Sequence, residues 1–187
     1  YGGINYDYLR SISETIDGGL VVGGFFRDVI TLTNGEKLTS RGAEDGIVIK
    51  YDKDGNIQWY KQIGGFGTEM IEAVQGTSDG GIIVGSRMSR QITLENGYTT
   101  KTNGLVLIKY TLTGEIEWFK DIPNGEHNYI KSISETDNRE IIIGVTFYGA
   151  GSVTLENGDA LYAGREYDSA IIKYSEKELA NPETIDA

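Results

Sequence analysis

An all-β fold built from repeated antiparallel sheets is what this sequence predicts, and three observations support it. First, the segment 45–59 recurs at 103–118, and its first half recurs at 168–174, so the chain has an internal period of about 60 residues. Second, Gly is abundant (26), Pro is scarce (2) and there are 12 Tyr, which favours short strands and tight turns over helices. Third, Asp-Gly and Asn-Gly pairs recur between apolar runs, as hairpin turns require.

Each repeat begins with two predicted strands joined by a turn. The first strand covers 8–15, 70–77 and 129–136. One position in it stays small, as an innermost strand beside a crowded axis would require: Ser11, Ala73 and Ser132. The turn is Asp17-Gly-Gly, then Asp79-Gly-Gly, where Gly supplies a positive φ, and we align it with Asp137-Asn-Arg in the third repeat. The second strand is a short, continuous apolar run ending in Gly, which predicts burial on both faces.

Two more predicted strands follow a long connection that carries an Asn-Gly hairpin. The third strand is apolar on both faces, and the fourth alternates apolar with polar residues, as a strand with one wet face does. No fourth strand follows the third repeat, and 175–187 is polar and acidic, as in a tail or linker. Four antiparallel strands per repeat, with the repeats stacked face to face, form the blades of a β-propeller. A β-sandwich or a β-solenoid is the alternative architecture.

These assignments divide the chain into blade 1 (1–65), blade 2 (66–124), an incomplete blade 3 (125–174) and a tail or linker (175–187). Propellers have about four to eight blades, so we expect these three four-stranded repeats to be part of a larger propeller. Open blade faces and strand edges would otherwise favour aggregation. Either further blades of the same protein precede this chain, or copies of the chain pair to close a ring.

The composition excludes several partners. The net charge of −11 argues against nucleic acid and against an anionic membrane surface, because both need clustered Lys and Arg. No apolar run approaches the roughly 20 residues that span a bilayer. The chain has no Cys, so it has no disulfide framework and no thiol nucleophile, which is compatible with a bacterial exported protein. No signal peptide is visible at Tyr1, so we expect a mature, processed or partial chain.

The motifs resemble a known repeat family. Ile63-Gly-Gly65, Asp79-Gly-Gly81, Gly85, Asp45-Gly46 and Ile49-Lys50 match the pattern of the bacterial β-propeller repeats called SBBP, over nearly the whole chain to Tyr174. This resemblance implies a large exported or surface-attached bacterial protein with a role in adhesion or carbohydrate contact. The segments 54–59 and 113–118, each ending in Trp, also resemble the blade ends of quinoprotein-like propellers, in which the Trp wedges between blades.

One turn has the look of a partial calcium loop. Asp52-Lys-Asp-Gly-Asn56 places oxygen ligands at alternate positions around a Gly, but it lacks the bidentate acid that completes such a loop. The equivalent turn at 111–115 has lost both aspartates. A plain hairpin turn is the main interpretation. We therefore predict no metal site and no cofactor, with Ca²⁺ as the open alternative.

Comparison of the repeats separates residues that serve the fold from candidate ligand-binding residues. Lysines present in all three copies, namely Lys50, Lys109 and Lys173, are expected to serve the blade. A site should lie where the copies differ, in the long connections. Arg and Tyr in such loops suit carbohydrate or protein contact, although ordinary surface is the alternative. The candidate ligand-binding residues are Arg27, Arg87, Arg90, Tyr148, Arg165 and Tyr167.

No catalytic residues are predicted. His127 is the single histidine, so neither a Ser-His-Asp relay nor a His-rich metal site can be assembled. The 28 acids guarantee neighbouring carboxylates by chance, and the sequence marks no pair for glycoside cleavage. We predict a non-catalytic, extracellular or cell-surface module for adhesion, carbohydrate or protein binding, or scaffolding. The alternatives are a polysaccharide-active glycosidase or lyase completed by absent blades, and a self-assembling ring or filament protein.

Overall fold

The computed structural model describes residues 1–100, 103–123, 128–148, 152–154, 160–162, 166–175 and 179, and every structural statement below concerns these residues. All the named elements in them are β-strands, and all the strand pairs are antiparallel. None of these residues forms a helix long and apolar enough to cross a bilayer. The all-β prediction is therefore confirmed.

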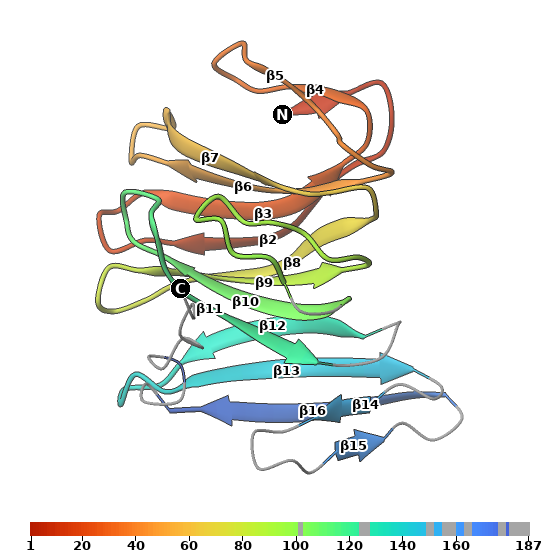
Figure 1. The fold of residues 1–187 in the computed structure, drawn as a ribbon. Coiled ribbons are helices and arrows are strands. Elements are labelled where there is room, and N and C mark those ends of the chain that lie inside the picture. The colour runs from red at the N-terminus through yellow and green to blue at the C-terminus, as the bar shows by residue number, and fades with distance from the viewer. Residues whose placement is uncertain are drawn as a thin grey trace.

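Three sheets follow one another along the chain and are stacked from the top to the bottom of Figure 1. In each, neighbouring strands are consecutive apart from an inserted hairpin. Sheet 1 contains β2 (Asp7–Glu14), β3 (Leu20–Phe26), β6 (Asp45–Tyr51) and β7 (Ile57–Ile63). Sheet 2 contains β8 (Glu69–Gly76), β9 (Ile82–Met88), β10 (Gly104–Tyr110) and β11 (Ile116–Pro123). Sheet 3 contains β12 (Tyr129–Glu135), β13 (Ile141–Tyr148) and β16 (Tyr167–Tyr174).

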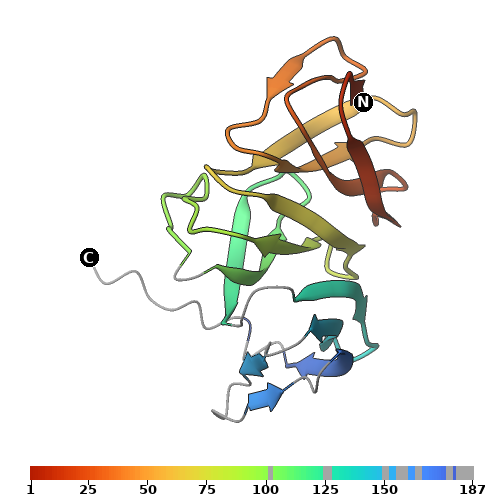
Figure 2. The same cartoon turned by 90° about the vertical axis from the view of Figure 1, so that its right-hand side faces the viewer.

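Small hairpins interrupt each sheet after its second strand, where the Asn-Gly turns were predicted. β4 (Val29–Thr31) and β5 (Lys37–Thr39) form the first, and β1 (Gly2–Gly3) pairs with β4. The second is reduced to the bridge between Thr93 and Thr99. β14 (Ser152–Thr154) and β15 (Ala160–Tyr162) form the third, which lies beside sheet 3 (Figure 2).

The first strands of the three sheets form one edge of the stack, which we call the inner edge, because β2 and β12 each contact β8. Each carries a β-bulge at the same place, which leaves Arg10, Glu72 and Lys131 without a paired residue on the second strand. Ser11 Oγ accepts a hydrogen bond of 3.0 Å from the Val74 amide of β8. A side chain at the predicted small position thus satisfies a backbone group of the neighbouring edge strand, which would otherwise be free to pair with another chain.

The repeated lysines hold the turns that join the first two strands of each sheet. Lys50, fully buried, donates to both carboxylate oxygens of Asp17 (3.1 and 2.9 Å), and Lys109 donates to Oδ2 of Asp79. Lys173 pairs instead with Glu140 at 2.9 Å. Hydrogen bonds in these turns align Thr136 with Thr15, which places Arg139 at the positive φ of Gly18. The predicted alignment of Asp137 with Asp17 is therefore wrong by one residue.

Two hydrophobic clusters lie between the stacked sheets, and a third packs the outer side of sheet 1 against the first hairpin. One cluster joins Val21 and Val48 of sheet 1 to the facing side of sheet 2, and a second joins the other side of sheet 2 to sheet 3. Trp59 bridges the first junction, because its Nε1 donates to the Leu112 carbonyl at 2.9 Å and its ring covers Gly114. The expectation that this Trp wedges between repeats matches its position.

Candidate ligand-binding site

The molecule has two unlike ends. The turn end carries the tight hairpins around Gly18, Gly55, Gly80 and Gly114. The loop end carries the longer connections, from the second strand of each sheet to the third and from the last strand of one sheet to the next. The predicted ligand-binding residues that the structure describes belong to the loop end, because they lie in or beside the long connections. Arg165 lies outside the described residues.

The structure gives two of these residues roles within their own loops. Arg27 forms an ion pair with Glu44 at 3.4 Å, and its Nε donates to the carbonyl of Ala43. These contacts tie together the two ends of the connection from β3 to β6. Arg90 is exposed, and its side chain lies beside Gly67 in the loop between sheets 1 and 2. Neither residue is brought to another predicted site residue.

Two predicted residues do come together. Tyr148 and Tyr167 are directly opposite each other at the loop end of β13 and β16, with ring centroids 4.6 Å apart. Both side chains are exposed. Opposed aromatic side chains stabilise an antiparallel pair, so this contact also secures the end of sheet 3.

Arg87 is the predicted residue with the most distinctive surroundings. Its guanidinium lies 5.1 Å from the centroid of the Tyr129 ring, and Lys131 Nζ lies 4.2 Å from the same centroid. One guanidinium nitrogen of Arg87 also contacts the sulfur of Met70 at 3.6 Å. Its Nε is buried and has no hydrogen-bond partner among the described residues. A tyrosine flanked by two cations is thus built from β8, β9 and β12 at the inner edge.

A related arrangement occurs on sheet 1. Arg10 lies over both Tyr8 (5.6 Å) and Phe25 (5.2 Å), and Tyr6 stacks on Tyr8 with centroids 6.3 Å apart. Arg10 and Lys131 occupy equivalent bulges, and Glu72 occupies the bulge between them on β8. We call Tyr8, Arg10, Glu72, Arg87, Tyr129 and Lys131 the inner-edge cluster. Sequence reasoning singled out only Arg87 of these, because a bulge has no sequence signature when its residue is an ordinary charged one.

Two buried carboxylates meet at the loop end. Burial is the main cause that raises the pKa of Glu69, and the nearby charge of Asp45 adds to it. Glu69 accepts hydrogen bonds from the Gly65 amide (2.9 Å) and Ser89 Oγ (3.4 Å), while Asp45 accepts from Arg41 N (3.0 Å) and Gln62 Nε2 (2.7 Å). Both side chains are fully buried. They shape the loops, and their inaccessibility makes them a poor acid pair for glycoside cleavage.

The turn with a partial resemblance to a calcium loop is closed by its own hydrogen bonds. Asp52 Oδ1 accepts from the amides of Asp54 (2.9 Å) and Asn56 (2.8 Å), and Oδ2 accepts from Asn56 Nδ2 (3.0 Å). These bonds lower the pKa of Asp52, the side-chain bond from Asn56 contributing most. Within the part of the chain that the structure describes, no group of three or more metal-ligating side chains gathers. The geometry is that of a plain hairpin turn.

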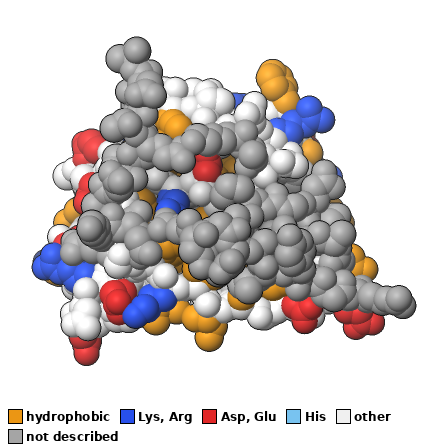
Figure 3. All heavy atoms as spheres, turned by 60° about the horizontal axis from the view of Figure 1, so that its bottom comes forward, with side chains coloured by type: hydrophobic (Ala, Val, Ile, Leu, Met, Phe, Trp, Pro, Cys, Tyr) orange, Lys and Arg blue, Asp and Glu red, His pale blue; other side chains and the backbone are white. Residues whose placement is uncertain are grey.

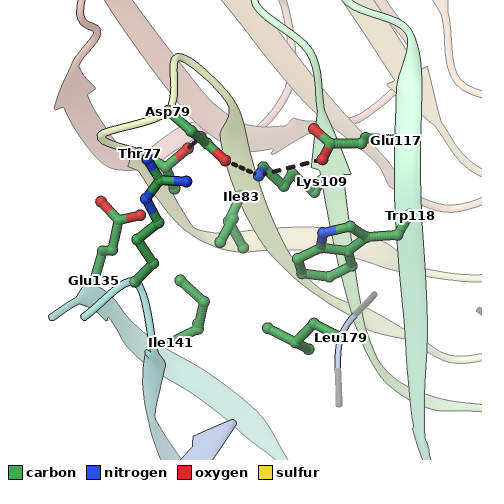
Figure 4. A pocket seen from close by; sticks show the side chains of 10 residues that line it. Thr77, Asp79, Ile83, Lys109, Glu117, Trp118, Glu135, Ile141 and Leu179 are labelled. Carbon is green, nitrogen blue, oxygen red and sulfur yellow. Dashed lines mark hydrogen bonds and ion pairs between the residues drawn. The ribbon is translucent and has the colours of Figure 1, made fainter. Parts of the chain in front are cut away.

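A crevice of about 70 Å³ opens between sheets 2 and 3 near the turn end (Figure 4). Lys109 lies on one wall between Asp79 and Glu117, while Trp118 and Leu179 lie on the apolar side. Burial alone would raise the pKa of Asp79, but hydrogen bonds from Lys109 and Thr77 outweigh it and lower the pKa to about 2. The crevice has room for a few waters only, and Lys109, Asp79 and Glu117 on its wall already bind one another.

A larger hollow of about 360 Å³ lies on the outer side, between β7 and the second hairpin. Arg41, Tyr60, Lys61 and Glu95 are among the residues that line it. Lys61 pairs with Glu95 at 2.8 Å, so the charge there is largely neutralised. Among the sites described, the inner-edge cluster therefore offers the cations and aromatic rings least committed to other partners.

Comparison with known proteins gives fold-level information only. No family model matches the chain. An uncharacterized WD repeat-containing protein, L264 of Acanthamoeba polyphaga mimivirus, is 21% identical over 190 residues, covering 84% of this chain and 14% of that protein. The chain thus spans about one seventh of this relative. A crystal structure of a protein of unknown function from Bacteroides caccae matches with a TM-score of 0.47 and 12% identity, over 89% of this chain and 48% of that chain.

Proposed function

We propose that the three sheets are blades of a β-propeller and that the chain is a non-catalytic binding module. Antiparallel meanders of four, four and three strands, whose first strands meet at one inner edge, support this architecture. The similarity to a WD repeat-containing protein supports it as well. The chain is a module of the bacterial cell surface, a placement motivated by its resemblance to SBBP repeats and by its acidic, cysteine-free composition. Labelling of intact source cells with an antibody against the chain tests that placement, and strictly internal signal would refute it.

The binding surface of this module is the inner-edge cluster, and the observation that carries the proposal is the Arg87–Tyr129–Lys131 arrangement. The described residues contain no carboxylate paired with Arg87 or Lys131, so both cations remain available to an anionic group. The Tyr129 ring provides a flat apolar surface between them. Aromatic faces and Arg forks together suit a ligand that combines a ring with a carboxylate or sulfate, such as an acidic oligosaccharide.

The test is a binding measurement by calorimetry with neutral oligosaccharides, acidic oligosaccharides and acidic peptides. We expect the acidic oligosaccharides to bind, and Arg87→Gln or Lys131→Gln to weaken binding about tenfold each, because a hydrogen bond to a charged group contributes about 1.5–3 kcal/mol. Lys53→Gln is the matched control, since it removes the same charge from an exposed turn at the other end of the molecule. Equal weakening by Lys53→Gln would reduce the effect to overall charge. Binding of peptides alone would make protein the partner, and the absence of any binding would refute the proposal.

A further inference from the structure

The two junctions between sheets use the same contact. At the first, Ile71 and Val74 of β8 press on Gly23 of β3, where an added Cβ would lie 2.6 and 2.7 Å from their methyl groups. At the second, Ile130 and Ile133 of β12 press on Gly85 of β9, with the corresponding distances at 3.0 Å. Each junction therefore fits branched side chains of one sheet into a hollow that a glycine leaves in the preceding sheet.

The outer side of sheet 1 is covered in part by the first hairpin, which buries Val22, Ile47 and Ile49. Its uncovered part presents the projecting half of this contact. Its leading face consists of Leu9, Ile12 and Leu20, which are equivalent to Ile71, Val74 and Ile82 in sheet 2. The three leading-face side chains are 62%, 64% and 41% exposed, whereas their sheet 2 equivalents are 0%, 4% and 0% exposed. Branched apolar side chains in the register of a junction are thus left in solvent.

The free side of sheet 3 presents the hollow half. Its trailing face consists of Ile142, Gly144 and Ile171, which are equivalent to Val21, Gly23 and Val48 in sheet 1. Ile171 is 80% exposed, whereas Val48 is fully buried. A Cβ on Gly144 would lie 2.7 Å from Ser132 Oγ of the same sheet, and it would meet no side chain of another sheet among the described residues. Figure 3 views this end of the molecule, where hydrophobic side chains reach the surface around residues that the structure does not describe.

We propose that the leading face of one copy of this chain packs on the trailing face of a second copy. The occupant is a second copy because the two faces are the separated halves of a contact that the chain makes twice internally, with the same strands, the same branched side chains and the same glycine. A further repeat of the same protein could make the same contact, and a 187-residue chain that stays monomeric at every concentration would favour that occupant over a second copy. The contact buries apolar groups whose internal equivalents are nearly inaccessible, which is the favourable term in association.

Such a contact joins two different faces, so it is heterologous. Heterologous contacts close into a ring if the rotation between copies allows it and otherwise extend into a filament. Association here occurs through sheet faces, not through the strand edges, where Ser11 already bonds the neighbouring strand. The proposal does not depend on the inner-edge cluster or on its ligand.

The first experiment is the mass of the 187-residue chain in solution as a function of concentration, by light scattering and sedimentation. We expect particles at multiples of 20.5 kDa whose fraction rises with concentration. Ile12→Lys should weaken association at least about a hundredfold, because it places an unpaired charge within an apolar contact. Phe66→Lys is the matched control, since Phe66 is 90% exposed and lies outside both faces. A monomer at every concentration, or equal loss with Phe66→Lys, would overturn the proposal.

A mixing experiment tests the pairing of unlike faces. Ile171→Lys removes the trailing face, and both Ile171 and Ile12 are exposed enough for Lys to be tolerated in the folded chain. Each variant alone should be monomeric. An equal mixture should form one-to-one complexes, because each partner retains the face that the other has lost. Failure of the mixture to associate, or unchanged association of Ile171→Lys alone, would show that the contact does not join these two faces.

Discussion

The glycines at the junctions allow a graded test of how the sheets pack. We consider Gly23→Ala, Gly85→Ala and Gly144→Ala, which add the same methyl group at equivalent positions of the three sheets. None of the three has a positive φ, so alanine fits the backbone at each. What differs is what the methyl group meets: Ile71 and Val74 of the next sheet at Gly23, isoleucines of the next sheet slightly further away at Gly85, and at Gly144 the hydroxyl of Ser132 on the same sheet, 2.7 Å away.

The expected order of stability follows from these distances. Contacts of 2.6–2.7 Å at Gly23 lie below any real Cβ separation, so the sheets must move apart, and we expect a loss in the free energy of unfolding of about 1–3 kcal/mol. At Gly85 the 3.0 Å contacts need smaller shifts, and we expect a loss at the lower end of that range. At Gly144 the methyl group would lie 2.7 Å from Ser132 Oγ, and rotation of this short side chain can relieve the clash without moving a sheet, so we expect a smaller loss than at Gly23.

The assay is urea denaturation followed by tryptophan fluorescence, at one protein concentration low enough to keep the chain monomeric. A second variant, Val74→Ala, makes space beside Gly23, so the double variant with Gly23→Ala should lose less than the sum of the two single changes. If Gly23→Ala were no more destabilising than Gly144→Ala, the tight junction and the open face would be indistinguishable. The account of both the core and the trailing face would then fail.

Three further predictions concern packing, charge and the inner edge. Trp118→Ala should lower the free energy of unfolding in urea by about 3–5 kcal/mol, because Trp118 is only 8% exposed. Trp59→Ala should cost less, because Trp59 is only half-buried. Equally small losses for both variants would show that neither ring is part of the core. The pKa of Asp17 is lowered to about 2, mainly by the Thr15 hydroxyl and also by Lys50, and the pKa of Asp79 is also about 2. The two carboxylates therefore stabilise the fold fully above the ordinary pKa of 3.8, and this stabilisation is lost as the pH falls through 2. The double variant Asp17→Asn/Asp79→Asn should lose less stability than the unaltered chain when unfolded by acid. Ser11→Ala should cost about 1 kcal/mol in urea denaturation by leaving the neighbouring strand amide unpaired, and no measurable loss would mean that water replaces the hydroxyl.

Much of the fold could be predicted because the same pattern of strands and turns occurs three times in the sequence. Apolar runs and Asp-Gly or Asn-Gly pairs locate nearly every strand and turn, and the lysine shared by all repeats marks an ion pair that fixes each first turn. The third turn was misaligned because the sequence suggested that Asp137 replaced Asp17. The backbone instead gives the positive φ to Arg139, and Glu140 takes over the contact with lysine. A single sequence cannot show such a transfer between neighbouring residues.

The candidate site was less predictable, for a physical reason. Differences between repeats identified Arg87 and the pair Tyr148 and Tyr167, but they selected Arg27 equally, whose charge is used by Glu44 within its own loop. Only distances separate an Arg that closes a loop from one that lies over an aromatic ring. Tyr129 and Lys131 were not predicted as site residues because they lie in a strand, and residues in predicted strands were assigned to packing and not to binding.

The bulges explain how one scaffold can carry a variable surface. At Arg10, Glu72 and Lys131 the backbone departs from the ladder in the same way, although the side chains differ in charge and length. The residue in a bulge has no partner on the second strand, so the exposed Arg10 and Lys131 can change with little effect on pairing, whereas Glu72 is buried. The junction glycines Gly23 and Gly85 and the turn lysines Lys50 and Lys109, by contrast, cannot change without disturbing the packing between sheets or the turns. If the inner edge binds a ligand as proposed, its specificity can change while the stacking of the sheets stays the same. The differences among Arg10, Glu72 and Lys131 therefore point to binding, whereas the identity of Lys50 and Lys109 points to a structural role.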